Sequence, residues 1–274
     1  MTIGKKFIRL KDIIKSYRSC LVAFSAGVDS TFLLKAASLA LPKEDILAVT
    51  AASATYPKEE LKQAKMLARY MGIRHKVVTS AELKDKRFVA NPPNRCYFCK
   101  KKLFLLLKRI AGKEKLSFVL DGSNISDGSD FRPGSLAGEE LRIKSPLKEA
   151  GLTKKDIRIL SRKLKLPTSD KPSLACLASR IPYNMKITPA VLKRIELAEG
   201  HLKSLFFGQA RLRHHGTLCR IEVSKNDLPR LLRKRKTIVD RLKKLGYNYI
   251  TMDLEGYRRG SLNSGLREKQ DKDA

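Results

Sequence analysis

The first half of the chain alternates between helical spacing of apolar residues and short runs rich in apolar residues. Helices are predicted over residues 5–18, 31–41, 57–71 and 98–111, and strands over 20–24, 46–52, 75–80 and 117–123. Because each apolar run is followed by a helix and then by another apolar run, the order is β-α-β. We therefore expect one parallel sheet with helices on both of its faces.

The second half predicts a different architecture. Residues 125–150 are rich in Gly, Ser, Pro and Asp, which predicts a loop of the kind that often carries function. Helices follow over 153–164, 189–205 and 226–245, with strands over 209–215, 218–224 and 247–253 and a turn at Gly216. The expected fold class is α/β. We expect a parallel-sheet domain over 1–168 and a smaller C-terminal α+β domain over 169–274. Residues 267–274 are expected to be disordered.

Charge dominates the composition. Among 274 residues, Lys and Arg number 58 against 27 Asp and Glu, which gives a formal net charge of +31. Such a field attracts phosphate-rich partners without choosing a nucleotide over a nucleic acid, and a solvated Lys-rich surface explains it equally well. No window approaches the ~20 apolar residues that span a bilayer, so no membrane association is expected.

The five cysteines are of two kinds. An odd number and the lack of a cleavable apolar leader predict a reducing cytoplasm. Cys20 and Cys219 lie in apolar strands and are expected in the core. Cys96 and Cys99 form a Cys-x-x-Cys pair at the start of a predicted helix, where the dipole favours thiolates; a redox disulfide, a zinc site and an iron–sulfur site all remain open. Cys176, in a Pro-flanked segment between the domains, is either core or part of a ligand cleft.

The segment AFSAGVDST runs from a predicted strand through small residues into a helix. Small side chains let backbone N–H groups and the helix N-terminus approach an anion closely, although an ordinary capped turn has the same composition. Asp29 is suited to holding a magnesium ion or orienting the loop. The candidate phosphate-binding residues are Ser25, Ala26, Gly27, Val28, Asp29, Ser30 and Thr31.

Two further groups of polar residues are placed for ligand binding. Asp121, Gly122, Ser123, Asn124 and Asp127 follow the last strand of the parallel sheet, at the carboxyl edge where such folds bind ligands, although Asp-Gly-Ser-Asn is also common in turns.

The second group lies on the predicted hairpin. Arg211 and Arg213 are two positions apart and so share one face of a strand, with Arg220 and Glu222 on the next strand. They are expected either to grip a phosphate or carboxylate or to form ion pairs on a solvent-facing hairpin.

These motifs resemble two nested groups of proteins. The loop resembles the SGGxDS loop of the PP-loop ATP pyrophosphatases, except that Ala26 stands in place of the first glycine. An alanine fits there if its φ is negative, with slightly less room for pyrophosphate. RCYFCKK, DGSNISD followed by RPG, PSLACLASRIPY, RLRHHG with RIEV, and GYRRGSLN are similar, over about residues 15–265, to the ATP-dependent sulfur transferases that assemble the nickel-pincer nucleotide cofactor of lactate racemase.

The resemblance implies a reaction and its cofactors. In that family, ATP with Mg2+ adenylates a carboxylate of pyridinium-3,5-dicarboxylate mononucleotide, and a sulfur nucleophile then expels AMP. Some members sacrifice one cysteine at the position of Cys176. In others three cysteines hold a 4Fe-4S cluster, and Cys96, Cys99 and Cys176 fit this type.

The resemblance also implies site residues and partners. Ser123, Asn124 and Asp127 join the nucleotide site, and the substrate nucleotide is expected to be bound by Arg180, Arg211, Arg213, Glu222 and Arg259. A homo-oligomer is implied, and a sulfide donor protein is a further possible partner. The rival functions are a PP-loop tRNA thiolase and a non-catalytic zinc protein that binds nucleic acid.

Overall fold

The structure is a computed structural model that describes residues 1–127, 133–172, 175–205, 207–258 and 260–261. Contacts divide the chain into two compact units. One consists of Met1–Phe88 with Pro93–Leu174, and the other of Val89–Pro92 with Ala175–Ala274. The predicted tail over 267–274 lies outside the described residues.

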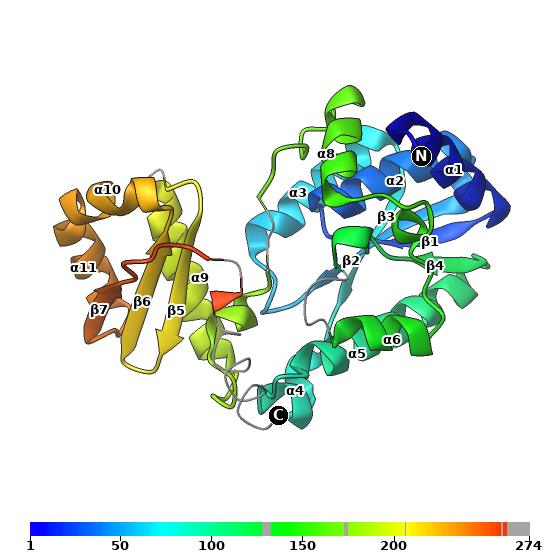
Figure 1. Cartoon of the computed structure of the whole chain (residues 1–274). Coiled ribbons are helices and arrows are strands. Elements are labelled where there is room, and N and C mark those ends of the chain that lie inside the picture. The colour runs from blue at the N-terminus through cyan, green and yellow to red at the C-terminus, as the bar shows by residue number, and fades with distance from the viewer. Residues whose placement is uncertain (128–132, 173–174, 206, 259, 262–274) are drawn as a thin grey trace, which may run out of the picture. The chain divides into compact units, whose positions relative to one another are not determined.

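The first half of the chain forms the expected β-α-β succession (Figure 1). Its elements are α1 (Ile3–Ser16), β1 (Cys20–Ala23), α2 (Val28–Ala40), β2 (Ile46–Ala52), α3 (Lys58–Met71), β3 (Arg74–Thr79), α4 (Lys86–Val89), α5 (Arg95–Lys113), β4 (Phe118–Leu120), α6 (Gly134–Glu140), α7 (Pro146–Glu149) and α8 (Lys154–Lys163). The four strands pair in parallel in the order β3-β2-β1-β4. The predicted fold class, α/β with a parallel sheet, is confirmed.

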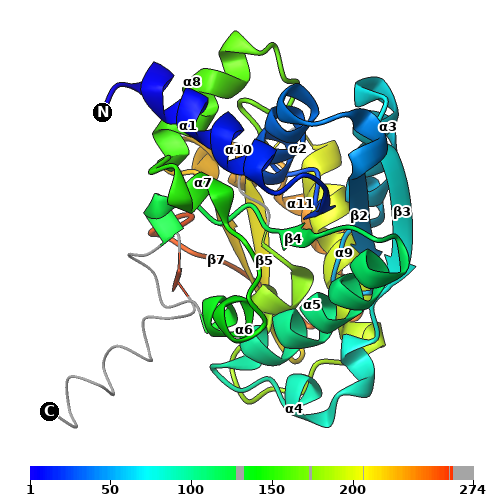
Figure 2. The ribbon, with the colours of Figure 1, turned by 90° about the vertical axis from the view of Figure 1, so that its right-hand side faces the viewer.

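Helices cover both faces of this sheet, as two views show (Figures 1 and 2). Cys20 and Val22 of β1 pack with residues of α1 and α2, whereas Leu21 between them packs with Phe104 and Leu107 of α5. Successive side chains of a strand point to opposite faces, so a strand buried on both faces is apolar throughout. This is why CLVA and ILAVTAA were recognisable as strands without any alternation of apolar and polar residues.

The expected loop over 125–150 was wrong in part, because α6 and α7 lie within it. Both glycines of α6 lie in a helix instead of a turn, and Gly134 is closely packed against α5. A Cβ on Gly134 would stand 3.0 Å from Cδ of Lys100 on α5, and one on Gly138 would lie 3.6 Å from the ring of Phe104. Small residues that indicate a loop by composition therefore allow α6 to lie close against α5.

The second unit is a three-stranded sheet with helices on one face. Its elements are α9 (Pro189–Ser204), β5 (Ala210–His215), β6 (Leu218–Val223), α10 (Leu228–Arg233), α11 (Arg235–Lys244) and β7 (Tyr249–Met252). β5 and β6 form the predicted antiparallel hairpin, and β7 pairs in parallel with β6. The single helix expected over 226–245 is interrupted at Lys234, which separates α10 from α11.

A short segment far away in the sequence belongs to this second unit. Asn91, fully buried and left-handed with φ of 59°, donates from Nδ2 to the carbonyls of Pro182 at 2.7 Å and Met185 at 2.9 Å. The backbone N–H of Ile187 donates to the carbonyl of Val89 at 2.9 Å. Residues 89–92 are thereby tied to the segment that follows Arg180. No helix in the described part of the chain is long and apolar enough to cross a bilayer.

Candidate functional site

The loop between β1 and α2 forms a small hydroxyl-lined turn at the helix start. Ser30 accepts from the backbone N–H of Ser25 at 3.2 Å, and the hydroxyls of Ser25 and Ser30 lie 3.0 Å apart. Gly27 caps α2 in an extended conformation, with no side-chain hydrogen bond at the cap. The first turn of α2 therefore presents backbone N–H groups beside two serine hydroxyls, as an anion-binding helix start requires.

Ala26 departs from the expectation for its backbone. Its φ is 51°, in the left-handed region, and its side chain is fully buried. The condition under which alanine was expected to fit, a negative φ, is not met. A residue with a Cβ pays about 1–2 kcal/mol for this conformation. Such strain persists where neighbouring groups hold the backbone, and the Ser25 and Ala26 carbonyls do accept hydrogen bonds, from Tyr56 Oη and Lys171 Nζ respectively.

Asp29 lies in the first turn of α2, directly after the loop in the sequence. Its carboxylate accepts from Nζ of Lys154 at 2.5 Å and from the amide of Asn124 at 3.5 Å. Burial raises the pKa of Asp29 above its usual range, with Lys154 acting in the opposite direction and the charge of Asp127 adding to the rise. A desolvated carboxylate next to a second carboxylate is an environment that favours a bound cation.

The segment after β4 meets the loop at the carboxyl edge of the sheet. A Cβ on Gly122 would stand 3.2 Å from the backbone nitrogen of Ser30, so a larger residue here would press against the first turn of α2. Ser123 donates to Asp121 at 2.7 Å, and Asp127 accepts from the N–H of Asn124 at 3.1 Å. Asn124 and Asp127 thus lie beside Asp29, whereas Asp121 is engaged by Ser123 and by Ser145 at 2.7 Å.

The cysteines divide as their sequence context predicts. Cys20 and Cys219 are buried, and burial raises the pKa of each thiol to about 12, so they are core residues. Cys96 is exposed and Cys99 half-buried in the first turn of α5, three positions apart and so on one face of the helix.

Cys176, in the second unit, is exposed as well. Across the described residues, no group of three or more His, Cys, Asp or Glu side chains is arranged to hold a metal ion.

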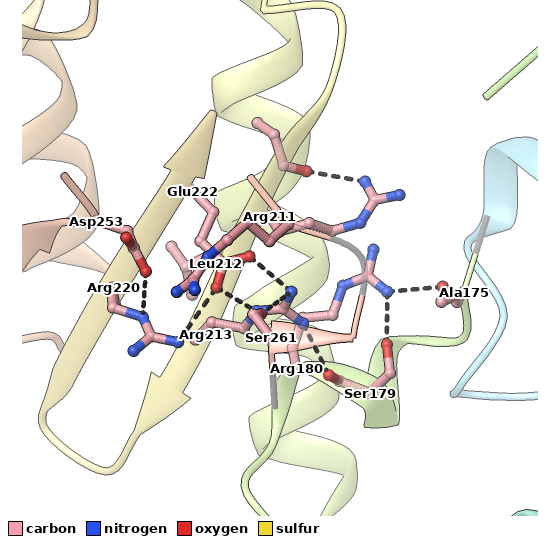
Figure 3. Close-up of polar contacts among 12 residues, drawn as sticks. Ala175, Ser179, Arg180, Arg211, Leu212, Arg213, Arg220, Glu222, Asp253 and Ser261 are labelled. Atoms are coloured by element: carbon pink, nitrogen blue, oxygen red, sulfur yellow. Dashed lines mark hydrogen bonds and ion pairs between the residues drawn. The ribbon is translucent and has the colours of Figure 1, made fainter. Parts of the chain in front are cut away.

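Arg211, Arg213 and Arg220 lie on the same face of β5 and β6, and Arg180 and Ser261 lie beside them (Figure 3). Arg213 donates to Oε2 of Glu222 at 2.6 Å and to the hydroxyl of Ser261 at 2.9 Å. Arg220 donates to the other oxygen of Glu222 at 3.2 Å and forms an ion pair with Asp253 at 3.3 Å. Burial disfavours the ionised form of Glu222, but Arg213 outweighs it, and the pKa of Glu222 lies below its usual range.

Arg180 has a partner that the sequence did not suggest. Its guanidinium binds the carboxylate of Glu199 through two hydrogen bonds of 2.8 and 2.9 Å, and it donates to the carbonyls of Ala175 and Cys176. The side chains of Arg180 and Glu199 are 2% and 7% exposed. A signal was present, because Glu199 occupies a position of α9 whose neighbours on that face are apolar and buried.

Arg211 and Arg213 are both nearly buried, so the alternative of a solvent-facing hairpin was wrong. Arg211 lies with its guanidinium over the ring of Tyr257 at 5.6 Å, and burial together with the charge of Arg180 lowers its pKa. Nε of Arg213 is buried and has no hydrogen-bond partner within the described residues. Among the described residues named here, the four arginines outnumber the three carboxylates of Glu199, Glu222 and Asp253. Arg259, also predicted here, lies outside the described residues.

The fold and the loop define a class: an α/β protein with a serine-lined turn at the carboxyl edge of a parallel sheet, followed by an arginine-rich α+β unit. A search against models of known protein families finds no match. The pyridinium-3,5-bisthiocarboxylic acid mononucleotide synthase of Lactiplantibacillus plantarum is 34% identical over 269 residues, which cover 98% of each chain.

Two uncharacterized proteins are similar over nearly their whole length. One, from Synechocystis sp., is 37% identical over 96% of this chain and 99% of its own length. The other, from Methanocaldococcus jannaschii, is 30% identical over 94% of this chain and 99% of its own length. The chain therefore belongs to the family of the pyridinium-3,5-bisthiocarboxylic acid mononucleotide synthase.

Proposed function

We propose that the protein is an ATP-dependent sulfur transferase that converts a carboxylate of pyridinium-3,5-dicarboxylate mononucleotide to a thiocarboxylate. The observation that carries the proposal is the near-full-length similarity to a protein named for making the bisthiocarboxylic product. A carboxylate oxygen attacks the α-phosphorus of ATP and pyrophosphate leaves. A sulfide then attacks the acyl carbon, and AMP departs with the carboxylate oxygen.

The loop between β1 and α2 supports the first step. Backbone N–H groups at the start of α2, with the hydroxyls of Ser25 and Ser30, are suited to binding the leaving pyrophosphate. ATP and Mg2+ are proposed to bind here, with Asp29 and Asp127 as carboxylates for the metal. Lys154 keeps Asp29 in place within the first turn of α2. Each donor aimed at the developing charge contributes roughly 3 kcal/mol to the transition state.

The arginine site supports binding of the substrate nucleotide. Its carboxylates and phosphate are anions, and Arg211, Arg213 and Arg220 lie on one face of β5 and β6. Glu222 holds two of these guanidinium groups in fixed directions, which reduces the entropy lost on binding. Nε of Arg213, a buried donor, is available for a ligand oxygen. Arg180 is proposed to support this binding site indirectly, through its ion pair with Glu199.

The three accessible cysteines fit an iron–sulfur group by their chemistry. Cys96 and Cys99 share a face of the first turn of α5, where the helix dipole favours thiolates, and Cys176 is exposed. A 4Fe-4S cluster held by three cysteines would have one iron without a protein ligand, and this iron would bind the added sulfide that is transferred. The buried Cys20 and Cys219 are not available to such a group.

The direct test uses protein purified and reconstituted without oxygen. The pyridinium dicarboxylate nucleotide, ATP, Mg2+ and sulfide are supplied, and mass spectrometry follows replacement of oxygen by sulfur while a coupled assay follows pyrophosphate. Both products are expected only when ATP and the nucleotide are present together. Pyrophosphate release that depends on tRNA instead of the nucleotide would contradict this function and favour a tRNA thiolase.

Replacing Cys99 with serine is expected to remove most of the bound iron. A serine hydroxyl is a far weaker ligand than a thiolate, so iron and acid-labile sulfide should fall from about four atoms each per chain to well below one. The measurement is metal and sulfide content after reconstitution, together with the visible spectrum.

The matched control is Cys219→Ala, which removes a buried thiol. It should keep the iron and lower stability by about 1 kcal/mol. Unchanged iron in Cys99→Ser would contradict the cluster. A mass loss at Cys176 after turnover would then indicate a cysteine that is itself the sulfur donor.

A further inference from the structure

Residues 169–172, here called the strap, contact the phosphate loop from outside. The ammonium group of Lys171 donates to the carbonyl of Ala26 at 3.0 Å, to the carboxylate of Glu60 at 2.5 Å and to the side-chain oxygen of Gln63. An ammonium group has three hydrogen-bond donors, so all three are used. Lys171 therefore joins α3, which carries Glu60 and Gln63, to the loop.

This contact differs from an exposed ion pair. The side chains of Lys171 and Glu60 are 13% and 10% exposed, and Ala26 is fully buried. Little water is present to replace the bonds, so the position of the Lys171 ammonium group is well defined. The carbonyl that it holds belongs to the one loop residue with a positive φ. The lysine thus contacts the loop at its most strained residue.

The direction of a carbonyl fixes the direction of the next N–H. In a trans peptide the C=O and N–H bonds point in opposite directions across one rigid plane. Lys171 holds the carbonyl of Ala26, so the N–H of Gly27 must point away from Lys171. Tyr56 holds the carbonyl of Ser25 in the same manner, which sets the N–H of Ala26. Two successive donors of the loop are thereby aimed by side chains outside it.

The strap is itself anchored to α8. Arg158 donates to the carbonyl of Ser169 at 2.6 Å and to that of Lys171 at 2.8 Å. Lys154, four residues earlier and so on the same face of α8, binds Asp29. One face of α8 therefore holds both the strap and the first turn of α2.

We propose that Lys171 is a positioning residue for the phosphate loop: by holding the Ala26 carbonyl it orients the Gly27 N–H toward the β- and γ-phosphates of bound ATP. Arg158 fixes the strap that carries it. This assignment rests on the proposed function, since it presumes that the loop binds ATP. AMP, which has neither of these phosphates, does not engage the oriented N–H.

The test compares two variants with one control. Lys171→Met removes the ammonium group, and Lys171→Met combined with Glu60→Gln also removes the buried carboxylate that would otherwise lose its partner. The control is Asp170→Asn, which breaks an exposed ion pair between the same strap and Arg162. Calorimetry measures binding of Mg2+ with α,β-methylene ATP, and separately of AMP. Hydrogen exchange of the peptide covering residues 24–31 is followed in the free protein.

Both Lys171 variants are expected to bind α,β-methylene ATP about tenfold or more weakly, the loss of one hydrogen bond to a charged group. AMP binding and the Asp170→Asn control should change by less than about threefold. Exchange over residues 24–31 should be faster in the variants. Equal weakening for AMP, or unchanged exchange, would overturn the assignment. If wild type binds no ATP analogue, the proposed function fails, and the exchange result still shows whether Lys171 holds the loop.

Discussion

Replacing Asp29 with asparagine is expected to reduce pyrophosphate release at least about a hundredfold while leaving the fold intact. An amide has the size of the carboxylate but lacks the negative charge through which a carboxylate attracts Mg2+. Asp29 lies in the first turn of α2, next to Asn124 and close enough to Asp127 for their charges to interact. The measurement is pyrophosphate formed in the presence of ATP, Mg2+ and the pyridinium dicarboxylate nucleotide.

Stability should move in the opposite direction, which separates a catalytic role from a structural one. Burial raises the pKa of Asp29, so the folded state binds this proton more tightly than the unfolded chain does. The ionised carboxylate therefore costs stability once the pH rises through the unfolded value of about 3.9 toward the higher folded value. We expect Asp29→Asn to unfold at the same or higher urea concentration than wild type at pH 7, with the difference shrinking near pH 3.

The matched control for this prediction is Asp12→Asn, which changes an exposed carboxylate of α1. It should leave both pyrophosphate release and the unfolding midpoint unchanged. Full pyrophosphate release by Asp29→Asn would remove this carboxylate from the reaction. A parallel loss of activity and stability would instead make Asp29 a structural partner of Lys154.

Most of the fold was predictable because its signals are local. Strands buried on both faces, such as β1 and β2, are apolar throughout, and α1 and α3 repeat apolar residues every three or four positions, so short windows predict these elements. The segment over 125–150 failed for a non-local reason. Gly134 lies in α6 close against α5, and composition alone cannot distinguish such a glycine from one in a loop.

In the candidate site as well, residues in contiguous motifs were predicted, and residues that act through distant contacts were not. The loop at residues 25–31 and the Cys96–Cys99 pair are contiguous motifs, so their sequence context was sufficient to single them out. Lys154, Lys171 and Glu199 were missed. Each completes a contact with a residue distant in the chain, and in a sequence with 58 Lys and Arg no individual lysine stands out. Even within the loop motif, the backbone conformation of Ala26 could not be predicted, because the sign of its φ depends on groups outside the loop.

Replacing Glu199 with glutamine is expected to destabilise the second unit by about 3–5 kcal/mol. Glu199 is the carboxylate partner of Arg180, and the two side chains are nearly inaccessible to water. Without it, the guanidinium charge stays buried, and the acceptors that remain to it among the described residues are carbonyls and a hydroxyl, from Ala175, Cys176 and Ser179. Glu199 Oε1 also accepts from the backbone N–H of Leu212 at 3.0 Å, so exchange of that amide measures the change at the site itself.

The matched control is Glu196→Gln on the same helix. Its pair with Lys193 spans three residues, and the side chain of Lys193 is 53% exposed, so the expected loss is within about 0.5 kcal/mol. Equal effects of the two variants would mean that water reaches the Arg180 pair and that Arg180 is open to a ligand carboxylate. A large loss from Glu199→Gln alone, reduced by added phosphate or nucleotide, would show that an anion can replace Glu199. In either case Arg180 would bind substrate directly, whereas a large loss unaffected by anions keeps it as a support for Arg211 and Arg213.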